Sequence, residues 1–168
     1  MSATKSMGGH ESPVAQTTTW LTPLHIIDAL GPFDLDPCGY PEWPTASKFI
    51  CLPDDGLAAE WSGRVWLNPP YGNAVWTWLD KLADHGDGIA LIFARTETAG
   101  FVRQVWQRAD AVKFLHGRLR FHTPDGGLGA GNAGAPSCLV AYGERNVRAL
   151  FDSPLAGTTV RLTSEADR

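Results

Sequence analysis

Cysteine is scarce in this sequence, which has three in 168 residues: Cys38, Cys51 and Cys138. Their odd number argues against a framework of disulfide bonds, and no two of them have the close spacing of paired metal ligands. Such usage is typical of a reducing compartment. We therefore expect a cytoplasmic protein without a structural metal ion.

Long apolar runs and internal repeats are also missing. No segment approaches the roughly 20 apolar residues of a membrane-spanning helix, and the N-terminus is polar, unlike a signal peptide. With 43% hydrophobic residues, the chain can form one domain with an ordinary core. We expect 1–18 to be a flexible leader, 19–152 to be the functional domain, and 153–168 to be a C-terminal tail or edge strand.

Positive charge is in the minority, with 14 Lys and Arg against 18 Asp and Glu and a net charge of −4. The basic residues are unevenly distributed, however. The segment 95–122 has a local balance of +4, which leaves −8 for the rest of the chain. This asymmetry is what a DNA-facing side on an acidic enzyme would give, although an ordinary solvated face is an equally good interpretation. The six basic residues are Arg95, Arg103, Arg108, Lys113, Arg118 and Arg120.

Hydrophobic periodicity predicts strands and helices in alternation. This order is typical of an α/β fold with a mostly parallel central sheet and helices on both faces. Thr22, Asn73 and Thr98 are candidate N-caps of helices. The segment 40–63 has no readable period because prolines interrupt it, and 126–134 is Gly-rich and predicted to be a mobile loop. The predicted strands are 33–36, 49–50, 64–67, 88–94, 111–115 and 137–142, and the predicted helices are 23–30, 74–85, 99–109 and 146–151.

The most informative motif is Asn68-Pro69-Pro70-Tyr71, which follows the predicted strand 64–67. The side-chain oxygen of Asn68 and the carbonyl of Pro69 could both accept N–H groups from a planar amine, localising its lone pair for attack on a methyl group. The two prolines restrict the backbone and hold that carbonyl in place. Tyr71 offers an aromatic face for stacking on a flipped base. The other interpretation is an ordinary turn with a packed tyrosine.

With these residues placed, the chain resembles the small phage-type DNA N6-adenine methyltransferases, which belong to the class I enzymes dependent on S-adenosylmethionine. The resemblance covers about 20–142 and implies a Rossmann-like class I fold. It rests on an ordered set of motifs: Trp20-Leu21-Thr22-Pro23, Asp34-Leu35-Asp36-Pro37-Cys38, Asp55-Gly56-Leu57, the segment 61–72 around Asn68, His116-Gly117-Arg118-Leu119-Arg120-Phe121 and Pro136-Ser137-Cys138-Leu139-Val140.

The resemblance also implies cofactor contacts. Asp36-Pro37-Cys38 would lie beside the methionine part of S-adenosylmethionine, Asp55 would accept from its adenine amine, and Thr22-Pro23 would close over its carboxylate. Structural alternatives exist, because Asp36 could form a turn while Asp55 and Thr22 could cap helices. The pattern also departs from the family, since the glycine-rich turn is reduced to Gly39 and no acidic residue stands where the ribose would be held.

DNA contacts are expected in the basic stretch, at Arg118 and Arg120, and also at Lys113. In the segment 116–121, the two arginines alternate outward while Leu119 and Phe121 face in, although a charge-protected edge strand would look similar.

These observations favour an adenine-specific DNA methyltransferase that acts by direct attack of the amine, with S-adenosylmethionine as cofactor and DNA as partner. Two alternatives remain at this stage. The same loop also serves enzymes that methylate a protein glutamine amide or an RNA guanine amine, and a degenerate relative could be a nucleic-acid-binding module. The sequence indicates neither the target site nor the oligomeric state.

Overall fold

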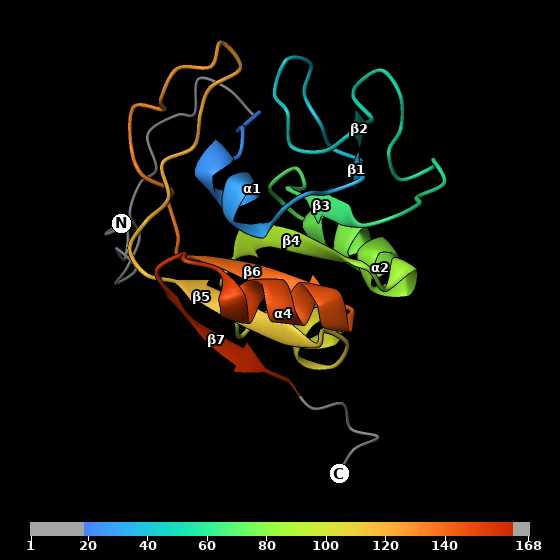
Figure 1. Cartoon of the computed structure of the whole chain (residues 1–168), viewed down its shortest axis with the longest axis vertical. Coiled ribbons are helices and arrows are strands. Elements are labelled where there is room, and N and C mark those ends of the chain that lie inside the picture. The colour runs from blue at the N-terminus through green and yellow to red at the C-terminus, as the bar shows by residue number, and fades with distance from the viewer. Residues whose placement is uncertain (1–18, 163–168) are drawn as a thin grey trace, which may run out of the picture.

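A seven-stranded mixed sheet forms the centre of the protein, with the strand order β2-β1-β3-β4-β6-β5-β7 (Figure 1). The computed structural model describes residues 19–162, so the predicted leader lies outside the described residues. The strands are β1 Leu35–Asp36, β2 Lys48–Phe49, β3 Val65–Leu67, β4 Gly88–Phe93, β5 Ala111–Leu115, β6 Ser137–Tyr142 and β7 Gly157–Arg161. The helices are α1 Leu24–Leu30, α2 Val75–His85, α3 Ala99–Phe101, the π-helix η1 Val102–Trp106, and α4 Glu144–Asp152.

The prediction of a mostly parallel sheet is correct for only half of the strand pairs. β1 pairs in parallel with β2 and β3, and β3 with β4, whereas the pairs β4–β6, β5–β6 and β5–β7 are antiparallel. The reason is that β6, which follows β5 in the sequence, inserts between β4 and β5 and runs antiparallel to both. Periodicity identifies strands, but it does not identify partners that are distant in sequence.

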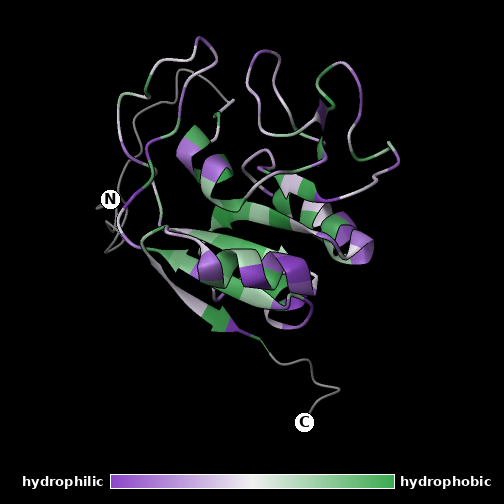
Figure 2. Ribbon diagram, in the orientation of Figure 1, coloured by the Kyte–Doolittle hydropathy of each residue, from purple (hydrophilic) through white to green (hydrophobic). Residues whose placement is uncertain are grey.

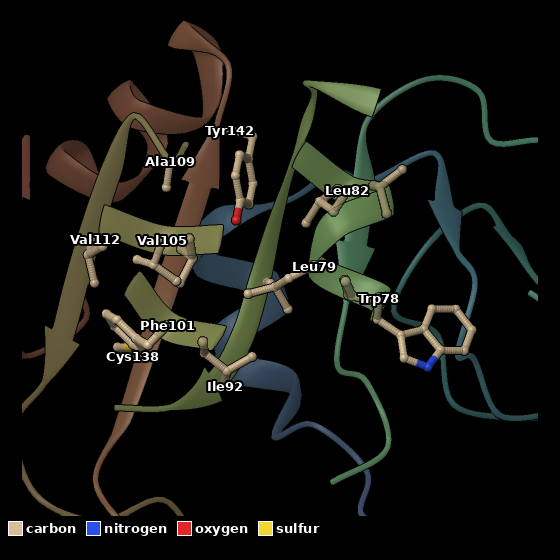
Figure 3. Close-up of a cluster of buried hydrophobic side chains, with 14 of the residues drawn as sticks. Trp78, Leu79, Leu82, Ile92, Phe101, Val105, Ala109, Val112, Cys138 and Tyr142 are labelled. Atoms are coloured by element: carbon tan, nitrogen blue, oxygen red, sulfur yellow. The ribbon is translucent and has the colours of Figure 1, made fainter. Parts of the chain in front are cut away.

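Helices lie on both faces of the sheet, and alternate strand residues pack against them. On one face, α2 and η1 bury Leu79, Leu82 and Val105 against strand residues such as Ile92, while the Trp78 ring of α2 extends away from Ile92 (Figure 3). On the other face, α1 and α4 cover the strand residues with the opposite alternation. The hydropathy colouring shows the result, with apolar strands inside and helices whose outer surfaces are polar (Figure 2).

The helix ends show which capping predictions are correct. The side chain of Thr98 accepts from Phe101 N–H at 3.4 Å, as an N-cap does. Thr22 and Asn73 are not the caps, because α1 and α2 begin one residue later than predicted, with Pro23 and Ala74 at the N-cap positions and no side-chain cap bond. α2 ends as predicted at Gly86, whose φ of 75° is the left-handed conformation typical of such a stop.

Two long connections approach the same end of the sheet as α1. Residues 37–63, apart from β2, and residues 116–136 both rise at the top of Figure 1 beside α1. The Gly-rich part of the second connection contains no helix or strand, but its backbone is bonded to the segment before it, with Gly129 N–H donating to Phe121 O at 2.9 Å and Ala133 N–H to Leu119 O at 2.7 Å. None of the helices in 19–162 is long and apolar enough to cross a membrane.

Candidate active site

Asn68 lies directly after β3, at the carboxyl end of that strand, where open α/β sheets bind ligands. Its side-chain Nδ2 donates to the carbonyl of Trp20 at 2.9 Å. Its Oδ1 is buried and has no hydrogen-bond partner among the described residues. A carbonyl can only accept, so the bond to Trp20 fixes the amide with Oδ1 on the other side. The site therefore holds an oriented acceptor that no other described residue uses.

Tyr71 packs against the sheet. Its ring stacks on Phe93 with a centroid distance of 4.5 Å and meets the edge of Phe121 at 6.0 Å. Burial raises the pKa of the Tyr71 phenol, so the hydroxyl stays protonated, and it too is buried without a partner. Between Asn68 and Tyr71, Pro69 is buried and Pro70 is exposed. One side of the Tyr71 ring is thus occupied by protein.

Asp36 lies at the carboxyl end of the neighbouring strand β1 and is 3% exposed. Its carboxylate accepts from Cys38 N–H at 2.9 Å and from the hydroxyl of Thr45. Burial raises its pKa to about 6, and these two hydrogen bonds lower it only in part. Burial also raises the pKa of the Cys38 thiol, with the negative charge of Asp36 as a second cause. Cys38 is accordingly a neutral thiol rather than a nucleophile.

Of the other predicted cofactor segments, the Asp55 turn lies against the Asp36-Pro37-Cys38 segment. The 55–56 turn lies against Pro37 so closely that a Cβ on Gly56 would be 2.1 Å from the Pro37 carbonyl oxygen. Asp55 itself is exposed, and its carboxylate accepts from Leu57 N–H at 2.8 Å, which is the local turn role that the sequence also allowed. Thr22 is buried, and its carbonyl accepts from Trp43 Nε1 at 2.8 Å.

The segment 40–63, which has no readable sequence period, is held in place by tryptophan and lysine side chains. Trp61 stacks on Trp78 of α2 at a centroid distance of 6.3 Å and donates from Nε1 to Gly56 O at 2.8 Å. Lys81 donates to the carbonyls of Leu57 and Ala59, both at 2.6 Å. These contacts fix the Asp55 turn relative to the sheet.

The basic stretch does not form one continuous face. Arg108 pairs with Asp80 and Asp84 of α2, at 2.6 and 2.5 Å. Lys113 is buried, and its ammonium donates to Ser153 Oγ at 2.9 Å and to the carbonyl of Leu150 at 3.1 Å. This ammonium group is occupied inside the fold, so the structure gives Lys113 an anchoring role below α4.

Arg118 and Arg120 are exposed and lie in a loop, not in an edge strand. Their guanidinium groups donate to Ala133 O at 3.3 Å and to Gly129 O at 2.8 Å, and neither forms an ion pair within 19–162. As the sequence predicted, Leu119 and Phe121 pack inward between them, with Phe121 5% exposed.

Sequence reasoning missed Trp20, Thr45 and Phe93, which orient Asn68, Asp36 and Tyr71. Trp20 contributes a backbone carbonyl, which no side-chain motif reveals. Thr45 and Phe93 are separated from their partners by connections whose path depends on the whole fold. In the described part of the chain, no group of His, Cys, Asp and Glu side chains is arranged to hold a metal ion.

Comparison with known protein families gives one match. The model of the family described as DNA N-6-adenine-methyltransferase (Dam) matches residues 9–154. No curated protein and no solved structure matches the chain.

Proposed function

Because the chain belongs to the DNA N-6-adenine-methyltransferase family, we propose that it transfers a methyl group from S-adenosylmethionine to the N6 amine of adenine in DNA. The observation that carries this proposal is the buried, unpartnered Oδ1 of Asn68. An unsatisfied buried acceptor costs stability, so its presence needs an explanation, and a ligand that satisfies it is one.

Asn68 is the residue to which we assign the main catalytic effect. Oδ1 would accept one N–H of the adenine amine and the Pro69 carbonyl the other, which localises the nitrogen lone pair and supports the positive charge that develops on nitrogen. The bond from Nδ2 to the Trp20 carbonyl holds the acceptor in place before substrate arrives, so little reorganisation is needed during the reaction.

Asp36, Pro37, Cys38 and the Asp55 turn fit the cofactor. At the carboxyl end of β1, the buried Asp36 carboxylate is held by the Cys38 N–H, and the backbone of the Asp55 turn approaches Pro37 closely. When bound, S-adenosylmethionine supplies a methyl group on a positively charged sulfur. The Asp36 carboxylate would balance that charge or the cofactor's amine, and Asp55 would accept from the adenine amine of the cofactor through its exposed oxygen.

No covalent bond to the enzyme is part of the proposal, and the neutral thiol of Cys38 is consistent with that. The amine nitrogen would form a bond to the methyl carbon as the bond from that carbon to sulfur breaks. The sulfur would leave as a neutral thioether, and a proton would then pass from the methylated nitrogen to solvent. Positioning and hydrogen bonding thus account for the rate. Tyr71 would hold the flipped base, with Phe93 supporting its ring from behind.

We assign the substrate strand to the side of the 116–136 connection. Arg118 and Arg120 are exposed there without acidic partners in the described chain, and they would contact phosphates. Lys113 is left out of this interface because its ammonium is engaged beneath α4.

The strand directions favour the Rossmann-like class I interpretation. β1, β2, β3 and β4 run in one direction, and two antiparallel steps through β6 bring β5 into that direction too. The site would then occupy the carboxyl ends of β1 and β3, where this architecture binds nucleotides.

The deciding experiment measures radiolabel transfer from S-adenosylmethionine into DNA, RNA and protein side by side. We expect label in DNA, recovered as N6-methyladenine after digestion to nucleosides. Label in protein glutamine or in RNA guanine would replace the proposal with the corresponding enzyme class. DNA binding without transfer to any substrate would indicate a binding module.

A further inference from the structure

A third buried polar group without a partner lies near the Asn68 loop. The hydroxyl of Ser137, the first residue of β6, is buried and forms no hydrogen bond within the described chain. Buried hydroxyls in folded proteins are almost always satisfied, so an orphan one needs an explanation. The first two such groups near this loop are Asn68 Oδ1 and the Tyr71 hydroxyl, which are also buried without a partner among the described residues.

Strand register places Ser137 at the candidate site. In the antiparallel pair β4–β6, Ser137 is directly opposite Phe93. Residues directly opposite each other point to the same face of a sheet. Phe93 is also the residue whose ring stacks on Tyr71. Ser137 is therefore on the same face as that ring and beside it.

Side chains alternate between the two faces along a strand, and this alternation places Asn68 on the same face as Ser137. Leu139 and Ala141, two and four residues after Ser137, pack in the cluster that α1 and α4 cover, and so does Trp66, two residues before Asn68. Trp20, whose carbonyl holds the Asn68 amide, packs against that cluster as well. Three unsatisfied polar atoms thus share one face and one end of the sheet.

We infer that the Ser137 hydroxyl reads the base, donating a hydrogen bond to one of the two ring nitrogens, N1 or N7, that flank the N6 amine of adenine. This inference rests on the proposed function. The geometry suits it because Asn68 would hold the amine itself, and a hydroxyl beside the same aromatic ring then lies next to the ring atoms that flank the amine. A hydroxyl is a donor that can rotate toward either nitrogen. Ser137 is in this sense a specificity-determining residue.

The test compares wild type with Ser137→Ala on three DNA substrates that carry adenine, 7-deazaadenine or 1-deazaadenine at the target position. Each analogue replaces one ring nitrogen with a C–H group. The quantity measured is the ratio of kcat/KM for adenine to kcat/KM for each analogue. Taking the ratio in both proteins cancels the intrinsic reactivity of the analogue.

We expect wild type to disfavour one of the two analogues on the order of tenfold, because the Ser137 hydroxyl is then left unpaired. In Ser137→Ala this preference should disappear, with the rate on natural adenine reduced. Ratios that are the same in the two proteins for both analogues would overturn the inference while leaving the proposed function intact. If wild type transferred no methyl group to adenine, the proposed function itself would fail.

The stability of the unliganded variants separates a reading role from a structural one. Ser137→Ala removes no hydrogen bond, so its unfolding midpoint should equal or exceed that of wild type. The matched control is Ser153→Ala, which removes a hydroxyl that accepts from Lys113 at 2.9 Å and should lower the midpoint. A fall in Ser137→Ala as large as that in the control would show that the hydroxyl has a structural partner, and it would contradict the inference.

Discussion

At the scale of single residues, the site combines side chains whose orientation is fixed by contacts with the rest of the protein. The Asn68 amide is fixed by a backbone carbonyl, the Asp36 carboxylate by a backbone N–H and a hydroxyl, and the Tyr71 ring by a second aromatic ring. Each of these contacts lowers the freedom of a side chain, and the Asn68 Oδ1 is still without a partner among the described residues. Preorganisation of this kind lets binding free energy act on the reaction rather than on ordering the site.

Replacing Asn68 with Ala removes one preorganised acceptor. We expect kcat to fall about 100-fold or more, equivalent to roughly 3 kcal/mol, with the Kd for S-adenosylmethionine little changed. Steady-state kinetics together with calorimetric titration of the cofactor would check both. A folded Asn68→Ala protein with near-normal turnover would remove Asn68 from the mechanism.

Asp36→Asn tests the buried carboxyl through its pH dependence. Because the folded-state pKa is raised to about 6, the fold favours the protonated form. The stability that this preference contributes is complete below the unfolded pKa of 3.8 and is lost as the pH rises through 6. Asn cannot ionise and retains an oxygen for the Cys38 N–H. At pH 8 the variant should therefore be more stable than wild type by roughly 2 kcal/mol, with little difference at pH 4.

Denaturant unfolding at pH 4, 6 and 8 measures this difference. If the Asp36 carboxylate balances positive charge on the cofactor, as we propose, the affinity of Asp36→Asn for S-adenosylmethionine should fall. If the free energies of unfolding of the two proteins differed by the same amount at pH 4, 6 and 8, Asp36 would not be held in a desolvated site.

At the scale of elements, local pattern was a good guide to helices and strands and a poor guide to their partners. The bounds of β6 and the end of α1 at Leu30 follow directly from periodicity and stop signals. The antiparallel position of β6 does not, because register and neighbours are set by packing of the whole sheet. The same holds for the site: the Asn68 loop is visible as a motif, whereas the Trp20 carbonyl and the Thr45 hydroxyl become relevant only when distant segments meet.

The 116–136 connection carries the prediction about DNA. If Arg118 and Arg120 contact phosphates, replacing either with Ala should weaken binding to all sequences alike and reduce the slope of log K against log salt by about one per contact. Arg103→Ala is a suitable control, because Arg103 is also exposed but lies on η1. Fluorescence anisotropy over a salt series measures the slopes. A double variant with the wild-type slope would show that DNA approaches from another side.

At the scale of the whole molecule, one buried guanidinium joins elements from three parts of the chain. Arg64 precedes β3 and is 8% exposed. It donates to Leu30 O at the end of α1 at 2.7 Å, to Pro32 O at 3.0 Å, and to the side-chain oxygen of Asn146 in α4 at 2.6 Å. Arg64 lies at the amino end of β3 and Asn68 at its carboxyl end, so this network and Asn68 are at opposite ends of the strand.

Arg64→Ala should therefore destabilise the protein without changing its chemistry. Three acceptors lose a charged donor, so we expect a loss of about 3 kcal/mol or more in the free energy of unfolding, with kcat unchanged at temperatures where the variant is folded. Arg145→Ala provides the comparison, because the Arg145 ion pair with Asp87 is exposed and should be worth at most about 1 kcal/mol. Equal unfolding midpoints in the two variants would contradict the role of Arg64 as a link.

The insertion of β6 between β4 and β5 also sets the order in which the chain can complete its sheet during synthesis. Among the strands of residues 19–162, β5 pairs with β6 and β7 alone, and both of them follow it in the sequence. Until residue 142 has left the ribosome, β5 has no partner and β4 exposes an open apolar edge. Unpaired edges of this kind are sites of aggregation. A nascent or truncated chain that ends before β6 is thus the form of this protein most in need of a chaperone.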